Sequence, residues 1–309
     1  MDAKIKALIG NIEKVIVGKR TPIVQTAAAL LIGGHVLLED VPGVGKTQLA
    51  AALAKSVNGT FSRVQMTPDI MPSDITGFSM LNRETGDFEY RKGAAFCNFL
   101  LADEINRASP KAQSSLLEVM EERQVSIDGN TYALPAPFMV IATQNPVETY
   151  GTYHLPEAQM DRFSMKISMG YPTASEESEI LDRNENDNPI TRIAAVLSTE
   201  DIIALQEQVK KVRASQNVKD YIIAVSNATR SDEGIKLGVS PRGSIALYKS
   251  AKAWAFMDGR DFITPQDVKD CCVCTLAHRI MLSPKGKSIY ETQENAFVKI
   301  LERVPVPTE

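Results

Sequence analysis

The chain has 309 residues, enough for one large domain or two modest ones, and its 44% hydrophobic and 23% charged residues are typical of a globular protein with a substantial core. The formal net charge of −4 excludes a global positive field that would hold nucleic acid or an anionic membrane. The most apolar stretch, residues 26–38, is interrupted by Gly33, Gly34 and His35, and it is too short to span a bilayer. Residues 1–10 lack a signal-peptide pattern, so we expect a cytoplasmic protein without a transmembrane segment.

The first half of the chain alternates short apolar runs with helical stretches. Buried strands are predicted at residues 35–39 (HVLLE), 98–103 (NFLLAD) and 138–143 (FMVIAT), and further strands at residues 61–65 and 164–169. Helices are predicted from Thr21-Pro22 to Gly33, at residues 47–57, from Ser109-Pro110 to about Arg123, and at residues 156–163. This alternation predicts an α/β fold with a central parallel sheet flanked by helices.

Two turn-rich segments predict hairpins. The first has candidate strands at residues 78–81 and 88–91, and the second at 125–127 and 131–134 around Asp128-Gly129-Asn130.

After Tyr171-Pro172 the pattern changes to helical stretches, with no convincing strand run. Helix starts are visible at Ser240-Pro241 and Thr264-Pro265. We therefore expect an α/β domain at residues 1–170 and a smaller all-α domain at residues 171–309.

A glycine-containing loop, residues 40–47 (DVPGVGKT), joins a predicted buried strand to a predicted helix. It matches the phosphate-binding Walker A pattern G-x-x-x-x-G-K-[ST], with aspartate in place of the first glycine. Gly43 and Gly45 let backbone amides approach phosphate oxygens, and the helix N-terminus adds to this anion cradle. Lys46 would reach the β- and γ-phosphates and Thr47 would ligate Mg²⁺.

The alternative is a glycine-rich turn whose lysine is merely solvated, and the position between strand and helix argues against it. Asp40 brings a negative charge close to the expected phosphates. We therefore expect its side chain to point away from the nucleotide.

An acidic pair, Asp103-Glu104, stands at the end of the predicted strand 98–103. Asp103 suits the Mg²⁺ shell of a Walker B site, and Glu104 is then placed to orient or polarise the attacking water. The same pair could form a helix-capping turn, but the phosphate-binding loop on a separate strand favours hydrolysis.

Asn145 follows the predicted strand 138–143 and precedes Pro146. A carboxamide at the end of a strand could hold the attacking water or the γ-phosphate. The alternative is a plain turn residue, because Asn-Pro favours turns.

Cys271, Cys274 and His278 have the i, i+3, i+7 spacing of one helical face. A metal site is one interpretation, but no fourth ligand is evident nearby. We favour a packing face of small residues.

The chain resembles the MoxR family of AAA+ ATPases over nearly its whole length. The matching runs are residues 33–39 (GGHVLLE), 67–77 (TPDIMPSDITG), 100–122 (LLADEINRASPKAQSSLLEVMEE), 142–146 (ATQNP), 155–163 (LPEAQMDRF) and 240–243 (SPRG). TPDIMPSDITG and DEINRA are the most specific of them. The resemblance implies an AAA+ P-loop core at residues 1–170 and a helical lid at 171–309.

The resemblance also implies roles for single residues. Asn145 matches sensor 1, Arg162 matches the arginine finger that reaches a neighbouring subunit's γ-phosphate, and Arg242 matches sensor 2 on the lid. Without the resemblance, Arg162 could be a surface ion pair with Asp161 or Glu157, and Arg242 a helix-start residue without a ligand.

The segment Val17-Gly18 matches the part of the family that contacts adenine. The residues expected to hold ATP are Val17, Gly18, Pro42, Gly43, Val44, Gly45, Lys46, Thr47 and Gln48, and those expected to hold Mg²⁺ are Thr47 and Asp103. Residues from about 69 to 96 match the helix-2 insert, and residues from about 124 to 137 match the pre-sensor-1 hairpin.

The resemblance implies a homo-oligomeric, hexameric ring that hydrolyses ATP and remodels, matures or activates partner complexes like a chaperone. It also implies a partner with a von Willebrand factor A domain. The alternatives are a nucleic-acid motor, a magnesium-chelatase-like ATPase subunit and a non-enzymatic nucleotide sensor. A nucleic-acid motor is disfavoured because the turn at residues 126–132 (SIDGNTY) carries no Lys or Arg.

Overall fold

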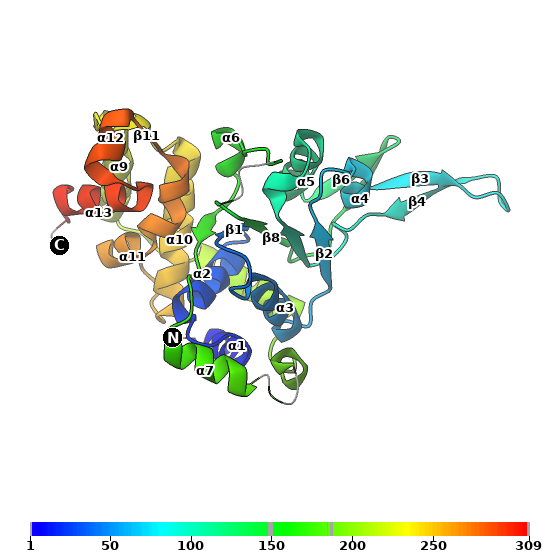
Figure 1. The fold of residues 1–309 in the computed structure, drawn as a ribbon. Helices are drawn as coiled ribbons and strands as arrows, with labels where there is room; N and C mark the ends of the chain where they lie inside the picture. Colours follow the sequence, from blue (N-terminus) through cyan, green and yellow to red (C-terminus); the bar gives the residue numbers. More distant parts are fainter. Residues whose placement is uncertain (1, 148–150, 184, 186–187, 308–309) are drawn as a thin grey trace.

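The computed structural model describes residues 2–147, 151–183, 185 and 188–307. Its centre is a five-stranded parallel sheet in the order β2-β5-β8-β1-β9 (Figure 1). The strands are β1 (Val36–Glu39), β2 (Phe61–Gln65), β5 (Phe99–Asp103), β8 (Met139–Gln144) and β9 (Met165–Ile167). Because all five strands run parallel, their carboxyl ends meet at one edge of the sheet and their amino ends at the other. The predicted α/β core is confirmed.

Helices cover both faces of the sheet, which explains why its central strands β1, β5 and β8 read as continuous apolar runs. Leu38 and Leu101 belong to a core shared with α1 (Ala3–Glu13), α2 (Arg20–Leu31) and α3 (Lys46–Ser56). The alternate residues Leu37 and Leu100 point to the other face, whose core is shared with α5 (Pro110–Glu122).

Both predicted hairpins are present, each as a separate two-stranded sheet. The first joins β3 (Gly77–Leu81) to β4 (Phe88–Lys92), follows the short helix α4 (Pro72–Thr76), and extends away from the body of the molecule (Figure 1). The second joins β6 (Gln124–Ile127) to β7 (Asn130–Ala133). The rings of Tyr90 on β4 and Tyr132 on β7 stack at 4.2 Å, so the two hairpins touch.

The second half of the chain is mostly helical, as predicted. Its elements are α7 (Ala174–Arg183), η2 (Pro189–Arg192), α8 (Thr199–Lys210), α9 (Gln216–Ser231), α10 (Pro241–Met257), α11 (Pro265–Leu276), η3 (Ala277–Arg279), α12 (Pro284–Tyr290) and α13 (Gln293–Arg303). One antiparallel ladder, β10 (Ile235–Leu237) with β11 (Met281–Leu282), corrects the all-α expectation for this half. Strands of three and two residues are too short to show a period-2 pattern.

Two further elements differ from the prediction. Helix α1 was not predicted, although the Asp2 carboxylate caps it by accepting from the backbone N–H groups of Lys4 and Ile5. The helix expected at residues 156–163 is shorter in the structure, where α6 spans Glu157–Met160. A short 3₁₀ helix, η1 (Ile105–Arg107), follows β5. None of the helices in the described part of the chain combines the length and apolarity that crossing a bilayer requires.

Candidate active site

The loop after β1 has the shape of an anion cradle. Gly43 and Gly45 have φ values of 86° and 93°, a left-handed conformation that strains residues with a Cβ. Helix α3 begins directly after the loop at Lys46, so the N–H groups of its first turn lack helical partners on that side. The Lys46 ammonium donates to the carbonyl oxygens of Asp40 (2.6 Å) and Val41 (3.3 Å), which places a positive charge over the loop.

Asp40 is turned away from the cradle, as expected. Its carboxylate accepts from the Ser168 hydroxyl (3.0 Å), from the Gly170 backbone N–H (3.2 Å) and from the backbone N–H of Met169. These groups follow β9, the neighbour of β1. The aspartate in place of the first glycine therefore fastens the start of the loop to the sheet.

A cavity of about 220 Å³ lies beside the loop. It is lined by Val15, Ile16, Val17, Lys19, Gly43, Val44, Gly45, Gln48, Pro172, Ile180, Asn188 and Pro189. Five of the predicted ATP-holding residues line it: Val17, Gly43, Val44, Gly45 and Gln48. Its mixture of apolar side chains and backbone suits a flat heterocycle next to the phosphate cradle.

The segment around α7 closes this cavity, a contact that no sequence motif predicts. Arg183 donates to the carbonyl oxygens of Glu13 and Lys14, both at 2.8 Å, and so holds α7 against the end of α1. Gly18 has a φ of 69°, and a Cβ there would overlap the Glu176 side chain of α7. The predicted adenine segment therefore passes under α7, which supplies Ile180 to the cavity.

The acidic pair lies at the carboxyl edge of the same sheet. The Asp103 carboxylate is mostly buried and accepts from the Thr143 hydroxyl at 2.6 Å and from Arg63 at 2.7 Å. Glu104 has a left-handed backbone, with φ 58°, which is rare for a residue other than glycine and is typical of constrained functional turns. Its carboxylate accepts from the Gln65 amide at 2.8 Å.

Sequence reasoning missed the three residues that fix this acidic pair. Arg63 and Gln65 are on β2, and Thr143 is on β8, where its hydroxyl also accepts from the Glu104 backbone N–H at 2.8 Å. Gln65 and Thr143 lie at the carboxyl ends of the strands that flank β5, and Arg63 reaches Asp103 from the middle of β2. Their position next to a Walker B strand in a parallel sheet was the available signal.

Asn145 is buried at the end of β8, at the same edge as the loop and the acidic pair. Its Oδ1 accepts from the Val147 backbone N–H at 3.1 Å, so the residue does form the turn that the Asn-Pro sequence favours. Sheet topology thus brings the Walker A loop, Asp103, Glu104 and Asn145 together.

The two predicted catalytic arginines are elsewhere. Arg162 precedes β9. Two residues later, the backbone N–H of Ser164 donates to the carbonyl oxygen of His35 at 2.8 Å, and His35 stands just before β1. This is the amino edge of the sheet. Because β1 has four residues, its length alone separates this edge from the Walker A loop by about 13 Å.

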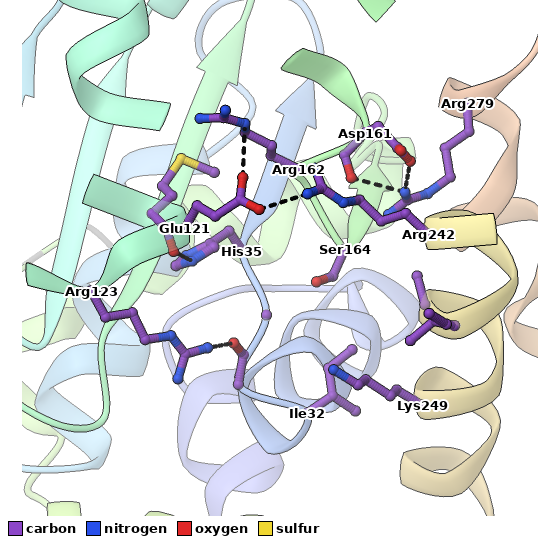
Figure 2. A pocket seen from close by; sticks show the side chains of 15 residues that line it. Ile32, His35, Glu121, Arg123, Asp161, Arg162, Ser164, Arg242, Lys249 and Arg279 are labelled. Atoms are coloured by element: carbon purple, nitrogen blue, oxygen red, sulfur yellow. Dashed lines mark hydrogen bonds and ion pairs between the residues drawn. The ribbon is translucent and has the colours of Figure 1, made fainter. Parts of the chain in front are cut away.

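Arg242 lies beside Arg162, at the start of α10. Both arginines line one cavity of about 220 Å³, together with Gly34, His35, Glu121 and Lys249 (Figure 2). The Glu121 carboxylate contacts Arg162 at 3.1 Å and Arg242 at 2.6 Å. Residues 80 positions apart in the chain therefore form one cationic group, at the edge of the sheet opposite their own phosphate loop.

A buried seam between the two halves of the chain holds this cationic group. The Asp161 carboxylate pairs with Arg279 and accepts from the Ser240 hydroxyl at 2.9 Å, and Ser240 caps α10 two residues before Arg242. Arg279 also donates to the Phe163 carbonyl oxygen at 2.6 Å. Asp161, the alternative surface partner of Arg162, instead binds Ser240 and Arg279 of the helical half.

The cysteine–histidine motif belongs to this packing and not to a metal site. Within the described ranges, no group of three or more His, Cys, Asp and Glu side chains is arranged to hold a metal ion. The Cys274 thiol donates to the Cys271 carbonyl oxygen at 3.3 Å, and His278 Nε2 bonds the Phe163 carbonyl oxygen at 3.0 Å. Burial raises the pKa of the Cys274 thiol to about 12, which disfavours the thiolate that a metal requires.

Comparison with protein families matches both halves of the chain. The model of the ATPase family associated with various cellular activities (AAA) matches residues 35–165, and the AAA lid domain matches residues 227–299.

Full-length relatives agree with these matches. The chain is 50% identical to the uncharacterised protein YeaC of Bacillus subtilis, over 97% of this chain and 94% of that one. It is 41% identical to Chaperone MoxR1 of Mycobacterium tuberculosis, over 98% of this chain and 82% of that one. It is 31% identical to Protein MoxR of Methylorubrum extorquens, over 96% of this chain and 93% of that one.

A solved structure from Cytophaga hutchinsonii, of a protein proposed to be an ATPase, superimposes with a TM-score of 0.91 at 40% identity. The superposition covers 99% of this chain and 95% of that one. Together with the site geometry, these likenesses identify the chain as a member of the MoxR family of AAA+ ATPases.

Proposed function

We propose that this protein hydrolyses ATP in a hexameric ring of identical subunits, in which each catalytic site is completed by residues of the next subunit. One observation carries this proposal: the phosphate loop and the acidic pair lie at the carboxyl edge of the sheet, whereas Arg162 and Arg242 lie at its amino edge. An arginine at the amino edge cannot reach its own phosphate loop, but in a head-to-tail ring it meets the loop of a neighbour.

The residues at the carboxyl edge fit magnesium-bound ATP. The cavity beside Gly45 suits adenine, and Lys46 suits the β- and γ-phosphates. The Thr47 hydroxyl and the Asp103 carboxylate are the oxygen donors that Mg²⁺ prefers. Asp103, which is held in place by Thr143 and Arg63, would hold the ion together with Thr47. When bound, Mg²⁺ would supply positive charge that offsets the negative charge of the phosphates.

Glu104 and Asn145 have complementary roles in this proposal. Glu104 orients and polarises the attacking water, with its carboxylate steadied by Gln65 at 2.8 Å. The turn bond of Asn145 uses Oδ1, so its Nδ2 amide is the group that we assign to the water or the γ-phosphate.

We assign two arginines of the neighbouring subunit to the negative charge that develops on the γ-phosphoryl group. In phosphoryl transfer the transition state spreads negative charge over the γ-phosphoryl oxygens, and a fixed cation stabilises it more than the ground state. Arg162 and Arg242 would supply this charge only when two subunits are in contact. Hydrolysis then depends on assembly.

Mixing two inactive variants tests the proposal. Lys46→Ala removes the phosphate grip, and Arg162→Ala removes the cation given to the neighbour, so each variant alone should be nearly inactive. In a mixed ring, an Arg162→Ala subunit keeps its loop and receives the arginine of a Lys46→Ala subunit. ATPase activity should therefore reappear on mixing, and a mixture as inactive as its components would contradict catalysis between subunits.

We further propose that the ATPase cycle drives chaperone-like remodelling of partner proteins in the cytoplasm. A relative at 41% identity carries the name chaperone, and the β3–β4 hairpin exposes an apolar surface made of Phe78, Met80, Leu81 and Phe88. Such surfaces on soluble proteins mark interaction sites. The family resemblance points to a von Willebrand factor A domain protein as partner, and its addition should raise the ATPase rate of the purified ring.

A further inference from the structure

Glu121 is the side chain that joins the two arginines of the amino edge. It lies near the C-terminus of α5, and its two carboxylate oxygens contact different partners: Oε2 meets Nε of Arg162 at 3.1 Å, and Oε1 meets Nη2 of Arg242 at 2.6 Å (Figure 2). Arg162 belongs to the sheet-bearing half and Arg242 to the lid. One carboxylate therefore links three segments of the chain.

The geometry of these contacts keeps both arginines useful to a second anion. The bond to Glu121 takes the Nε–H edge of Arg162, and it does not itself occupy the four N–H groups on the two terminal nitrogens. In the same way, the contact of Arg242 with Glu121 engages Nη2 and not Nη1. A guanidinium with five donors can hold a carboxylate on one edge and a phosphate on another.

The local charges show why such a link is needed. The described residues that line this cavity include the cations Arg123, Arg162, Arg242, Lys249 and Arg279. Their only acidic counterparts in this lining are Glu121 and Asp161. Asp161 is paired with Arg279, so Glu121 is the carboxylate that offsets the repulsion between Arg162 and Arg242.

The ion pairs of Glu121 with the two arginines are also too exposed to contribute much to the stability of the fold. About a third of the Arg162 side chain and half of the Arg242 side chain remain accessible to solvent. Ion pairs with this exposure contribute little to the free energy of unfolding. Asp161, Ser240 and Arg279 already hold the two halves of the chain together without Glu121.

We infer that Glu121 is a positioning residue that presents Arg162 and Arg242 as one preassembled pair to the triphosphate of the neighbouring subunit. The inference rests on the proposed catalysis between subunits. Without the carboxylate the two cations repel each other and sample separate rotamers, so fewer encounters place both on the phosphates. A positioning error of this kind lowers the rate of hydrolysis and not the affinity of a subunit for its own nucleotide.

The test compares Glu121→Gln with Glu122→Gln, the exposed next residue of the same helix. We expect Glu121→Gln to lower kcat on the order of tenfold. Nucleotide affinity, melting temperature and ring formation in sedimentation should be unchanged, because Glu121 is far from its own phosphate loop. Glu121→Asp, which keeps the charge, should recover part of the rate, and Glu122→Gln should match the wild type.

A double-mutant cycle separates positioning from a general structural effect. In an Arg242→Ala background no pair remains to be aligned, so Glu121→Gln should then change kcat by less than about twofold. An equal fold-loss in both backgrounds, or a wild-type kcat for Glu121→Gln, overturns the inference. The proposed catalysis between subunits would survive that outcome if the mixture of Lys46→Ala and Arg162→Ala still regained activity, and it fails if the mixture stays inactive.

Discussion

The two edges of the central sheet carry different chemistry and are built differently. At the carboxyl edge, short-range motifs supply the phosphate loop and the acidic pair, each directly after a buried strand. At the amino edge, Arg162 and Arg242 come from segments far apart in the chain, which are brought together by contacts such as Asp161–Ser240, Asp161–Arg279 and those of Glu121 with both arginines. The motifs of the first edge are visible in local sequence, although side chains from other strands hold them in place, whereas the grouping at the second edge appears only in the folded chain. Each edge is half of the site that we propose.

The largest expected effect comes from removing the cation at the amino edge. Arg162→Ala should lower kcat by about a thousandfold, because arginines given to a neighbouring P-loop site contribute at least this much in well-studied enzymes. Steady-state ATPase assays at saturating ATP would measure the loss. Nucleotide binding by the isolated variant should stay normal, and a matching loss of affinity would place Arg162 at its own phosphates and remove the contrast between the edges.

Glu104→Gln tests the carboxyl edge alone. We expect a loss in kcat of about a hundredfold or more, since the amide cannot polarise the attacking water. The variant should still bind ATP and form rings, which sedimentation with ATP would show. A variant that hydrolyses ATP at the wild-type rate would exclude Glu104 from the role assigned to it.

We expect acid to lower the stability of the folded chain through His35, which lies at the amino edge. Burial lowers the pKa of His35 to about 4 from its usual 6.5, and the neutral ring bonds the Met120 carbonyl oxygen and the Val140 backbone N–H. The unfolded chain therefore binds a proton between these two values and the folded chain does not, so stability is present above about pH 6.5 and falls as the pH drops toward 4. Lowering the pH from 7 to 5 should therefore reduce the free energy of unfolding by about 2 kcal/mol through His35.

Urea unfolding at the two pH values would measure this loss. Burial also lowers the pKa of His278, so that residue adds to the loss in the same direction. His35→Gln should be less stable at pH 7 but should show a smaller difference between pH 7 and 5. An unchanged pH difference would show that His35 is not responsible.

A smaller effect is expected from the residues that steady the acidic pair. Gln65→Ala removes the amide that bonds Glu104 at 2.8 Å and should lower kcat by about tenfold, since it leaves the carboxylate present but less well placed. The comparison is Gln144→Ala, at the end of β8 on the same edge, which should change kcat less. A Gln65→Ala rate equal to that of wild type would show that Glu104 needs no support from β2.

The smallest effect on basal activity is expected in the β3–β4 hairpin, away from both edges. Phe88→Ser should leave the ATPase rate without client unchanged, because Phe88 is 74% exposed and contributes little to the core. It should reduce the protection of a heat-unfolded model protein from aggregation, measured by light scattering. Full protection by the variant would remove the hairpin from the proposed client surface.

The contrast between the edges also explains what the sequence could predict. The strands of the sheet and the Walker A loop follow from apolar runs and glycine spacing, which are local properties. The grouping of Arg162 with Arg242, the contact of Glu104 with Gln65 and the closure by α7 of the cavity beside the Walker A loop depend on which segments meet in three dimensions. No local pattern encodes these contacts.

The ladder β10–β11 was missed for a different reason: it has two or three residues in each strand, below the length at which alternation is visible.

The seam at Asp161 has a consequence for how such a ring would move. Arg279 is almost fully buried and ties the lid to the segment before β9 through Asp161 and the Phe163 carbonyl oxygen, and Ser240 adds a further tie. We expect a subunit held together in this way to move as one unit. In the proposed ring, the energy of ATP hydrolysis would then appear as movement between adjacent subunits, at the contacts between them.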